Sequence, residues 1–482
     1  MLGRIGGVHA DRGAGRVPRQ MADGLFRKVL IANRGEIALR VLRACHDLGI
    51  RAVVAYSEAD RESLPVRLAD EAVCIGPGPA ARSYNSIPAI VSAALLTGCD
   101  ALHPGYGFLA ENAYLADICA QVGVTFIGPR PETIERMGNQ AEARATMAAA
   151  GVPLVPGTDG PIETLGAARK AATAIGYPVL IKAVAGGGGR GMRVAPDDGA
   201  LVRLLPVAQA EAQAAFGNGE VYLERYLEKP RHVEVQVLGD ASGHVVAVGE
   251  RDCSIQRRHQ KVLEEAPAPG LAEETREALF AAAIAGARSV GYENAGTLEF
   301  LLDADGRFYF MEMNTRIQVE HPVTEMVTGI DLVAWQIRLA AGMPLTIEPA
   351  ACEPRGHAIE CRITAEDAAA DFAPGVGVVT TYVAPGGPGV RVDSHLYTGY
   401  AVPPFYDSLL AKVVTWGQDR DEAAARMERA LTETVIAGLP QTAPFLRRLV
   451  ADEAFRRAEI HTGFLADNLD RLVPATGAAG ER

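Results

Sequence analysis

The chain has 482 residues, which is too long for one hydrophobic core and predicts three or four lobes. Its composition, 48% hydrophobic and 22% charged, is that of an ordinary soluble globular protein, and no apolar run approaches the roughly 18 residues of a membrane-spanning helix. The net charge of −12 excludes a general basic field for nucleic acid, so local cations must hold any anionic substrate. The seven cysteines are odd in number and form no CxxC pair. They argue against a disulfide framework and a structural zinc site, and they fit a reducing cytoplasm.

Residues 1–24 are predicted to be a disordered extension. The first twenty are rich in Gly and Arg and lack the apolar core of a secretory signal. Asp11 and the absence of serine disfavour a transit peptide, and Met21 is an alternative start of translation.

A strand over Lys28–Ala32, a helix over Ile37–Leu48 and a strand over Ile50–Tyr56 predict a βαβ unit with a parallel sheet. Asn33, Arg34 and Gly35 follow the first strand, at the sheet edge where open α/β proteins bind ligands. The chain has no GxGxxG here, so no dinucleotide is inferred. The glycine-rich loop at 101–108 is either a tight turn or a ligand contact.

One helix is predicted over Pro131–Ala150, followed by a strand over Tyr177–Lys182 and a glycine-rich turn at 186–191. This turn is not a P-loop, because it lacks the Gly-Lys-Ser/Thr ending and a following helix. Its bare backbone N–H groups suit a flap over phosphates, although a hairpin tip without function is the alternative. Lys182 at the inner end of an apolar strand needs an anionic partner, for which a nucleotide phosphate is suitable.

Three further segments carry polar side chains of unusual placement. Glu224 lies among hydrophobic residues and either accepts a hydrogen bond from an adenine amine or pairs with Arg225. In the strand over 231–238, His232 lies on the polar face, where a lone histidine is usually structural. The segment 250–261 concentrates five basic residues and is either a solvated face or an anion clamp. These five are Arg251, Arg257, Arg258, His259 and Lys261.

The segment 297–322 predicts two strands joined by a two-residue turn at Asp305 and Gly306. Counting outward from this turn places Glu299 opposite Glu312. Like charges that face each other across a ladder are destabilising, so a cation between them is expected. The alternative is an amphipathic edge hairpin with a solvated charged face.

Beyond that hairpin, alternate positions are polar: Glu312, Asn314, Arg316, Gln318 and Glu320. In an extended chain these side chains line one side over roughly 26 Å, at about 3.3 Å per residue. This length predicts a metal at one end of the row and a second chemical centre at the other.

The chain resembles the biotin carboxylases, the ATP-grasp subunits that carboxylate biotin in biotin-dependent carboxylases. The resemblance runs from about Lys28 to Leu469. It rests on six motifs: ANRGEIA (32–38), HPGYGFLAEN (103–112), GGGGRGM (186–192), RHVEVQV (231–237), ERDCSIQRRHQK (250–261) and EMNTRIQVEHPVTE (312–325). Other ATP-grasp ligases, such as carbamoyl phosphate synthetases, share the Glu…Glu-x-Asn pattern but not this combination.

The resemblance implies a mixed α/β and α+β fold of the ATP-grasp type. Its parts are an N-terminal parallel α/β domain (25–130), a linker helix (131–154), a mobile lid subdomain (155–226), a catalytic core (227–345), a C-terminal mixed α+β domain (346–469) and a flexible tail (470–482).

The resemblance also implies a mechanism. ATP phosphorylates bicarbonate to carboxyphosphate, which decomposes to CO2 and phosphate, and the CO2 is captured by N1′ of biotin. The family's ligands for Mg²⁺ or Mn²⁺ correspond to Glu299, Glu312 and Asn314. This set agrees with the preference of Mg²⁺ for hard oxygen donors. The bicarbonate site matches Arg316, Gln318 and the backbone N–H of Val319. Glu320 matches the general base, and Arg362 matches the arginine that stabilises the biotin anion.

Further positions match the family's nucleotide contacts, and Lys261 among them matches the partner of the transferring γ-phosphate. These positions are Gln140, Lys182, Gly187, Gly188, Gly189, Glu224, Leu227, His232, Gln256, His259 and Lys261.

Two positions depart from the family pattern. Gln140 stands where the family has a phosphate-binding lysine, which predicts a raised KM for ATP rather than inactivity. Ala185 stands where the first of five flap glycines is common, and little effect is expected from this change.

The third lobe is expected to contain strands over 356–363, 377–383 and 390–392 and a helix over 421–437. No Ala-Met-Lys-Met biotinylation motif occurs, so biotin is expected on a separate carrier protein and the carboxyltransferase on another chain. Arg40 and Arg43 match family positions at a homodimer surface, although Asp47 replaces the usual glutamate and an exposed helix face is the alternative. A homodimer is expected, with no nucleic acid or membrane partner.

The expected function is that of the biotin carboxylase component of an acetyl-CoA or related acyl-CoA carboxylase, in the cytoplasm. Three alternatives are the corresponding component of a two-chain pyruvate carboxylase, a carbamoyl phosphate synthetase-like ligase, and a catalytically silent nucleotide-binding scaffold.

Overall fold

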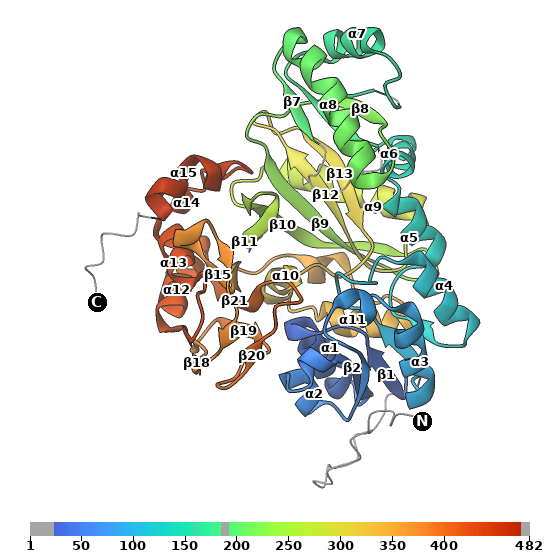
Figure 1. The fold of residues 1–482 in the computed structure, drawn as a ribbon, viewed down its shortest axis with the longest axis vertical. Helices are drawn as coiled ribbons and strands as arrows, with labels where there is room; N and C mark the ends of the chain where they lie inside the picture. The colour runs from blue at the N-terminus through green and yellow to red at the C-terminus, as the bar shows by residue number, and fades with distance from the viewer. Residues whose placement is uncertain (1–23, 159, 185–191, 474–482) are drawn as a thin grey trace.

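The computed structural model describes residues 24–158, 160–184 and 192–473 (Figure 1). The glycine-rich flap predicted at 186–191 therefore lies outside the described residues, as do residues 1–23 of the predicted extension and 474–482 of the predicted tail. No helix of the described part is long and apolar enough to cross a membrane.

The N-terminal lobe is built on a five-stranded parallel sheet in the order β3-β2-β1-β4-β5. Its strands are β1 (Lys28–Ile31), β2 (Arg51–Ser57), β3 (Glu71–Gly76), β4 (Ala101–His103) and β5 (Thr125–Phe126), and its helices are α1 (Gly35–Asp47), α2 (Leu64–Leu68), α3 (Ile87–Thr97) and α4 (Ala113–Gln121). Val29, Leu30 and Ile31 are completely buried, because helices cover both faces of a parallel sheet. The predicted βαβ unit is confirmed.

The single helix predicted over 131–150 is wrong, because the structure has two helices there. They are α5 (Pro131–Gly138) and α6 (Gln140–Ala149). Asn139 between them has an extended backbone, with φ −88° and ψ 106°, and its side chain accepts a hydrogen bond from the backbone N–H of Glu142 at 3.2 Å. Asn is a strong N-cap residue, so it starts a new helix instead of continuing the old one. This break makes Gln140 the first residue of α6.

The lid has a small hydrophobic core of its own and stands above the large sheet in Figure 1. It is a three-stranded antiparallel sheet in the order β7-β6-β8, packed against two helices. These elements are β6 (Val179–Ala183), β7 (Arg193–Ala195), β8 (Val221–Arg225), α7 (Leu165–Ile175) and α8 (Asp198–Phe216).

An eight-stranded antiparallel sheet runs through both the core and the third lobe, in the order β13-β12-β9-β10-β11-β14-β21-β19. Its strands are β9 (Arg231–Gly239), β10 (Val245–Arg257), β11 (Gln260–Ala266), β12 (Asn294–Leu302), β13 (Phe308–Asn314), β14 (His357–Thr364), β19 (Val390–Ser394) and β21 (Leu409–Gly417). The helices of the core are α9 (Glu273–Ser289), α10 (His321–Thr328) and α11 (Leu332–Ala340). The pairing of β11 with β14 makes the two lobes one continuous sheet.

Two predicted elements of the third lobe are wrong in detail. The strand expected over 377–383 is two short strands, β17 (Gly377–Val378) and β18 (Thr381–Val383), which pair with β20 (Ala401–Val402) and β22 (Val435–Ala437). The helix expected over 421–437 is α12 (Arg420–Glu433), because the β-branched residues that follow it join β18 as β22. The remaining elements are β15 (Glu366–Asp367), β16 (Ala373–Pro374), α13 (Ala443–Ala451), α14 (Glu453–Arg456) and α15 (Phe464–Leu472).

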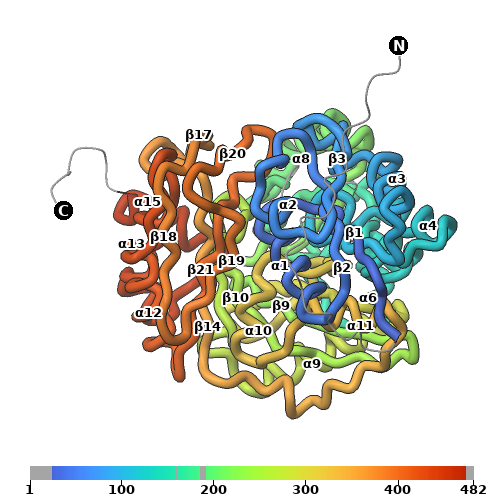
Figure 2. Tube along the Cα trace, turned by 90° about the horizontal axis from the view of Figure 1, so that it is seen from below, coloured from blue at the N-terminus to red at the C-terminus, as the bar shows by residue number. Residues whose placement is uncertain are grey.

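The third lobe also lies beside the N-terminal lobe, so that β19 and β21 face α1 (Figure 2). Arg40 of α1 is buried in this region and forms ion pairs with Glu325 at 2.8 Å and Asp331 at 2.6 Å. The alternative of an exposed helix face is therefore wrong for Arg40, whereas Arg43 is exposed.

Candidate active site

The β12–β13 hairpin places Glu299 opposite Glu312, as predicted, but the predicted two-residue turn is wrong. Leu302 pairs with Phe308, so the turn contains more residues than Asp305 and Gly306. This shifts the register by one residue near the turn, and a bulge at Met311 shifts it back before Glu312. The two carboxylates face each other because these two irregularities compensate.

Lys261 of β11 is the centre of a buried carboxylate cluster. Its Nζ lies 2.6 Å from Glu234 of β9, 2.9 Å from Glu299 of β12 and 2.5 Å from Glu320, which precedes α10. Although burial disfavours the charged ammonium, these three carboxylates raise the pKa of Lys261 well above its ordinary value. Lys261 therefore stays charged.

Glu299 is the best satisfied carboxylate of the cluster. Its Oε1 accepts hydrogen bonds from Lys261 at 2.9 Å, Asn314 Nδ2 at 2.9 Å and Gln318 Nε2 at 2.7 Å, and its Oε2 lies 3.1 Å from His232 Nε2. Burial opposes ionisation, but Lys261 and His232 together hold the pKa of Glu299 well below its usual range.

Glu312 has the opposite environment. Burial and the facing Glu299 raise the pKa of Glu312 to about 7. Among the described residues Glu312 has no ion-pair partner. A divalent cation between the two carboxylates would supply the missing positive charge, and carboxylate oxygens are the donors that Mg²⁺ prefers. The donor set therefore fits such an ion, although Asn314 directs its amide nitrogen toward Glu299 and its Oδ1 toward Arg316.

His232 is not an isolated structural histidine. Although burial disfavours the imidazolium, Glu299 raises the pKa of His232 to about 9, and Gln256 lies 3.0 Å from its Nδ1. Glu234, two residues further along β9, was not predicted as a site residue. It is completely buried and accepts from Arg251 at 2.6 Å. The alternation of polar and apolar residues along β9 could have identified it, because Glu234 shares the parity of His232.

The extended polar row predicted beyond Glu312 is wrong after Asn314, where β13 ends. The chain bends and enters α10, whose Pro322 suits a helix start. Arg316 donates to Asn314 at 2.9 Å, to Gln318 at 3.0 Å and to Glu111 at 2.9 Å. The bend brings Gln318 to Glu299 and Glu320 to Lys261, so the two chemical centres lie in one cluster and not at opposite ends of a long row.

Glu320 is completely buried and ionised. Burial favours its neutral form, but Lys261 and Arg362 lower the pKa of Glu320. Arg362 of β14 lies 2.9 Å from Glu320 Oε2 and 2.5 Å from Glu264 Oε1. The third lobe therefore supplies Arg362 as the cation beside Glu320, the residue predicted to be the general base.

A second cation of the third lobe holds the loop before α10. Lys412 of β21 is completely buried, and its Nζ donates to the carbonyl oxygen of Val319 at 2.8 Å. It also forms an ion pair with Glu36 at 3.1 Å, and Tyr106 donates to the same carboxylate. A cavity of about 120 Å³ opens beside Glu36 and Tyr106, at the carboxyl ends of β1 and β4. This is the sheet edge at which open α/β proteins bind ligands.

Of the nucleotide contacts predicted on the lid, Lys182 and Glu224 lie together. The carboxylate of Glu224 lies between Arg144 of α6 and Lys182 of β6, whose Nζ donates to it at 3.0 Å. The suggested pairing of Glu224 with Arg225 is therefore wrong. Arg144 was missed by the sequence analysis, although it lies one helical turn after Gln140. Leu227 belongs to a small apolar cluster that also contains Val155 and Tyr309.

The basic segment 250–261 does not act as one clamp. Arg251 is buried against Glu234, while Arg257 and Arg258 pair with Asp371 at 2.7 and 2.9 Å. His259 is exposed in the turn between β10 and β11. Of these five residues, Arg251 and Lys261 reach the carboxylate cluster. Gly187, Gly188 and Gly189 lie outside the described residues.

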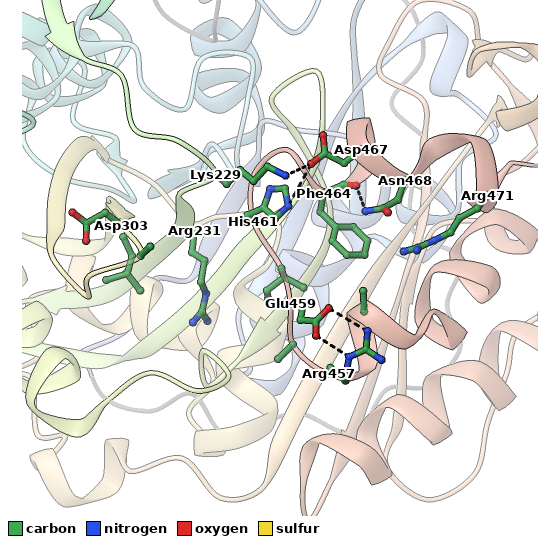
Figure 3. Close-up of a pocket in the computed structure, with 15 residues that line it drawn as sticks. Lys229, Arg231, Asp303, Arg457, Glu459, His461, Phe464, Asp467, Asn468 and Arg471 are labelled. Carbon is green, nitrogen blue, oxygen red and sulfur yellow. Dashed lines mark hydrogen bonds and ion pairs between the residues drawn. The ribbon is translucent and has the colours of Figure 1, made fainter. Parts of the chain in front are cut away.

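A larger cavity of about 690 Å³ lies away from this cluster, between the start of β9, the β12–β13 turn and α14–α15 (Figure 3). Four of its charged side chains are paired with each other, Lys229 with Asp467 at 2.7 Å and Arg457 with Glu459 at 2.8 Å, whereas Arg231, Asp303 and Arg471 pair with residues outside the lining. None of the site residues predicted from the sequence lines this cavity.

Three family models match the chain. They are described as "Biotin carboxylase, N-terminal domain" over residues 25–134, "Carbamoyl-phosphate synthase L chain, ATP binding domain" over 139–348, and "Biotin carboxylase C-terminal domain" over 360–467.

Known proteins match over nearly the whole length. The chain is 55% identical to the biotin carboxylase of a Nostoc species, covering 92% of this chain and 99% of that protein. It is 52% identical to one of the pyruvate carboxylase subunits of Methanothermobacter thermautotrophicus, covering 92% and 90%. The biotin carboxylase domain dimer of Hydrogenobacter thermophilus 2-oxoglutarate carboxylase was solved with MgADP, ADP and bicarbonate. It matches with a TM-score of 0.88 and 48% identity over 93% of this chain and 99% of that chain. The expected fold class is confirmed by these similarities.

Proposed function

Since the chain belongs to the biotin carboxylase family, we propose that it uses ATP to join bicarbonate to N1′ of biotin carried on a separate protein. The observation that carries this proposal is the position of Glu320. It is a buried, ionised carboxylate held between Lys261 and Arg362, so a base, a phosphate-binding cation and an oxyanion-binding cation meet at one point.

Bicarbonate is held by Arg316, Gln318 and the backbone N–H of Val319. Glu320 removes the bicarbonate proton, and the resulting oxyanion attacks the γ-phosphorus of ATP with departure of ADP. Lys261 stabilises the charge on the transferring phosphoryl group. Because Lys261 is bound to three carboxylates, nucleotide phosphates must compete with Glu234, Glu299 and Glu320 for its ammonium.

Glu299, Glu312 and Asn314 would hold Mg²⁺ or Mn²⁺. The ion, when bound, offsets negative charge on the phosphates of the nucleotide. The raised pKa of Glu312 supports this assignment, because a carboxyl group that resists ionisation without a neighbouring cation is suited to one that arrives with the substrate.

Carboxyphosphate then breaks into CO2 and phosphate inside the site. The phosphate takes the proton from N1′ of biotin, and the nitrogen attacks CO2. Arg362 stabilises the negative charge that develops on the ureido oxygen of biotin. Its guanidinium is buried and already directed at Glu320, the residue that prepares the other substrate.

The remaining nucleotide contacts are proposed at Gln140, Lys182, Gly187, Gly188, Gly189, Glu224, Leu227, His232, Gln256 and His259. Lys182 and Glu224 support this set, because they lie together where the lid faces the core. The apolar cluster around Leu227 suits the face of a base. We keep the predicted domain limits, with the helices α5 and α6 in place of the single linker helix, the lid over 155–226 and the core over 227–345.

The biotin carrier and the carboxyltransferase are proposed to be separate chains that meet this enzyme, itself a homodimer, in the cytoplasm. The dimer of the Hydrogenobacter domain supports the homodimer. An acetyl-CoA or acyl-CoA carboxylase is the proposed assembly. The alternative is a two-chain pyruvate carboxylase, which the similarity to the Methanothermobacter protein supports.

The test is ATP hydrolysis by the purified enzyme with free biotin as acceptor. Turnover should require bicarbonate and rise with biotin, and an amine or amino-acid substrate should not replace either. Hydrolysis stimulated by an amine and indifferent to biotin would instead identify another ATP-grasp ligase. Purification of the enzyme from its own cells, followed by detection of the biotinylated partner, identifies the assembly.

A further inference from the structure

A second pair of carboxylates faces across the sheet on the side of Arg362. Glu264 of β11 lies directly opposite Glu360 of β14 in the antiparallel ladder. Both side chains are completely buried. Two ionised carboxylates in this position would repel each other and would also lack water to solvate their charges. The pair therefore needs a cation or a proton.

Most cations near Glu264 and Glu360 already form ion pairs with other groups. The cations around the pair are Arg362 of β14, Lys412 of β21 and Lys261 of β11, and the ionised Glu320 before α10 adds a negative charge. Lys261 is bound to its three carboxylates, and Lys412 is bound to Glu36 and to the carbonyl oxygen of Val319. Arg362 remains, and it lies 2.5 Å from Glu264 Oε1.

Glu360 has no such partner. Within the described residues, neither of its carboxylate oxygens has a hydrogen bond, and it forms no ion pair. One guanidinium that is already shared with Glu320 cannot neutralise two further carboxylates. One of the two facing groups must therefore be neutral.

We propose that the facing pair of Glu264 and Glu360 holds a single proton, bound to Glu360, and that the two act together as positioning residues for Arg362. The one negative charge that remains lies on Glu264 and holds the guanidinium in place beside Glu320. The proton keeps Glu360 neutral and prevents the pair from drawing Arg362 away from the biotin side of the site. This inference rests on the role proposed for Arg362.

The direction of the titration agrees with this geometry. Burial and Glu320 raise the pKa of Glu264 to about 7, although Arg362 acts in the opposite direction. Burial raises the pKa of Glu360 further, well above its ordinary value, and the opposition of Lys412 does not cancel this effect.

The first experiment tests the positioning role through Glu264→Gln in the full-length enzyme. The KM for free biotin should rise by about tenfold, the factor expected for a lost interaction with a charged group, while the KM for ATP stays within about twofold. If the amide variant does not accumulate as folded protein, Glu264→Asp keeps the charge, shortens its reach and should raise the KM for biotin by a smaller factor.

Glu265→Gln is the matched control. Glu265 is the next residue of β11, is equally buried, and pairs with His357 at 2.8 Å and Arg420 at 2.7 Å, away from Arg362. The Glu265→Gln variant should have a lower melting temperature than the wild type and an unchanged KM for biotin. Equal biotin KM values for the two variants would overturn the positioning role. If Arg362→Gln keeps normal biotin-dependent turnover, the role proposed for Arg362 itself fails, which is a separate result.

The second experiment tests the proton through Glu360→Gln. The pKa of Glu360 is raised well above its ordinary value in the folded protein, so the stability that its proton contributes is fully present below the ordinary pKa of glutamate and is lost as the pH rises through the raised pKa. The amide cannot ionise, so the unfolding equilibrium of the variant should lose this pH dependence. The ratio of folded to unfolded protein should therefore rise in the variant, relative to the wild type, by up to about tenfold for each pH unit between 5 and 7. Parallel pH profiles for the two proteins would show that the pair holds no proton.

Discussion

Glu299 lies directly opposite Glu312 on the β12–β13 ladder, yet the pKa values of the two carboxyl groups are displaced in opposite directions. Glu299 is surrounded by donors, including Lys261 and His232, whereas Glu312 faces the charge of Glu299 without a partner of its own among the described residues. The two residues form an unequal pair. Glu299 is ionised without a metal ion, whereas Glu312 ionises fully when a cation approaches.

Glu312→Gln is expected to change the pH dependence of stability. The pKa of Glu312 is raised to about 7, so the neutral form stabilises the fold in acid, and this contribution is lost as the pH rises through about 7. The variant stays neutral, so its free energy of unfolding should rise relative to that of the wild type between pH 5 and 8, by at most about 3 kcal/mol. Urea unfolding without divalent ions measures this difference.

Addition of Mg²⁺ with ADP provides the control for that prediction. The ion should stabilise the wild type by mass action and should stabilise Glu312→Gln much less, because the variant has lost a charged ligand. A variant whose stability responds equally to Mg²⁺ and ADP would remove Glu312 from the metal site.

Gln140→Lys is expected to lower the KM for ATP by about tenfold, since it adds a charge-assisted contact at the position where the family has a lysine. Ala141→Lys is the matched control, because Ala141 is the next residue of α6, is exposed, and receives the same charge. Initial rates at varied ATP compare the two. Identical KM values for the wild type and Gln140→Lys would mean that this position does not limit nucleotide binding.

Arg144→Ala tests whether the cations around Glu224 work as a pair. Without Arg144, Glu224 retains Lys182 as its partner and competes more strongly with phosphate for that ammonium. The KM for ATP should rise by about tenfold, and adding Glu224→Gln should recover part of the loss, because the competing charge is removed. Strict additivity of the two changes would exclude coupling between these residues.

Glu320→Gln is expected to reduce bicarbonate-dependent turnover by about two to four powers of ten, the usual contribution of a general base. Nucleotide binding, measured at equilibrium, should remain. Because the pKa of Glu320 is lowered, turnover of the wild type should not be limited by this residue at moderately acid pH. Full bicarbonate-dependent turnover by the variant would show that another group takes the proton.

The sequence was most informative where a local pattern determines the structure. The βαβ unit follows from strand and helix periodicity, and Glu299 faces Glu312 as expected. The facing of Glu299 and Glu312 was predicted correctly because the longer turn and the bulge at Met311 shift the register in opposite directions. Neither irregularity has a clear sequence signal. Asn139 did carry a signal, since an Asn after Gly138 favours a new helix start.

The residues that were missed are those whose role depends on distant partners. Glu234, Glu264 and Glu360 look like ordinary alternating residues of strands. Only the order of the eight-stranded sheet brings Glu234 to Lys261, Glu264 to Arg362 and Glu360 opposite Glu264. The bend after Asn314 was missed for a related reason. Alternation of polar residues is equally compatible with a strand and with a loop whose side chains converge on a cation.

The continuous sheet has a consequence for how this enzyme unfolds. Because β11 pairs with β14, a chain that ends at residue 345 would expose the backbone edge of β11 and would remove Arg362 and Lys412. The core and the third lobe should therefore melt in one cooperative transition, whereas the lid, with its separate hydrophobic core, can open locally at lower cost. Protection from hydrogen exchange should follow the sheet across the lobe boundary and fall at the lid.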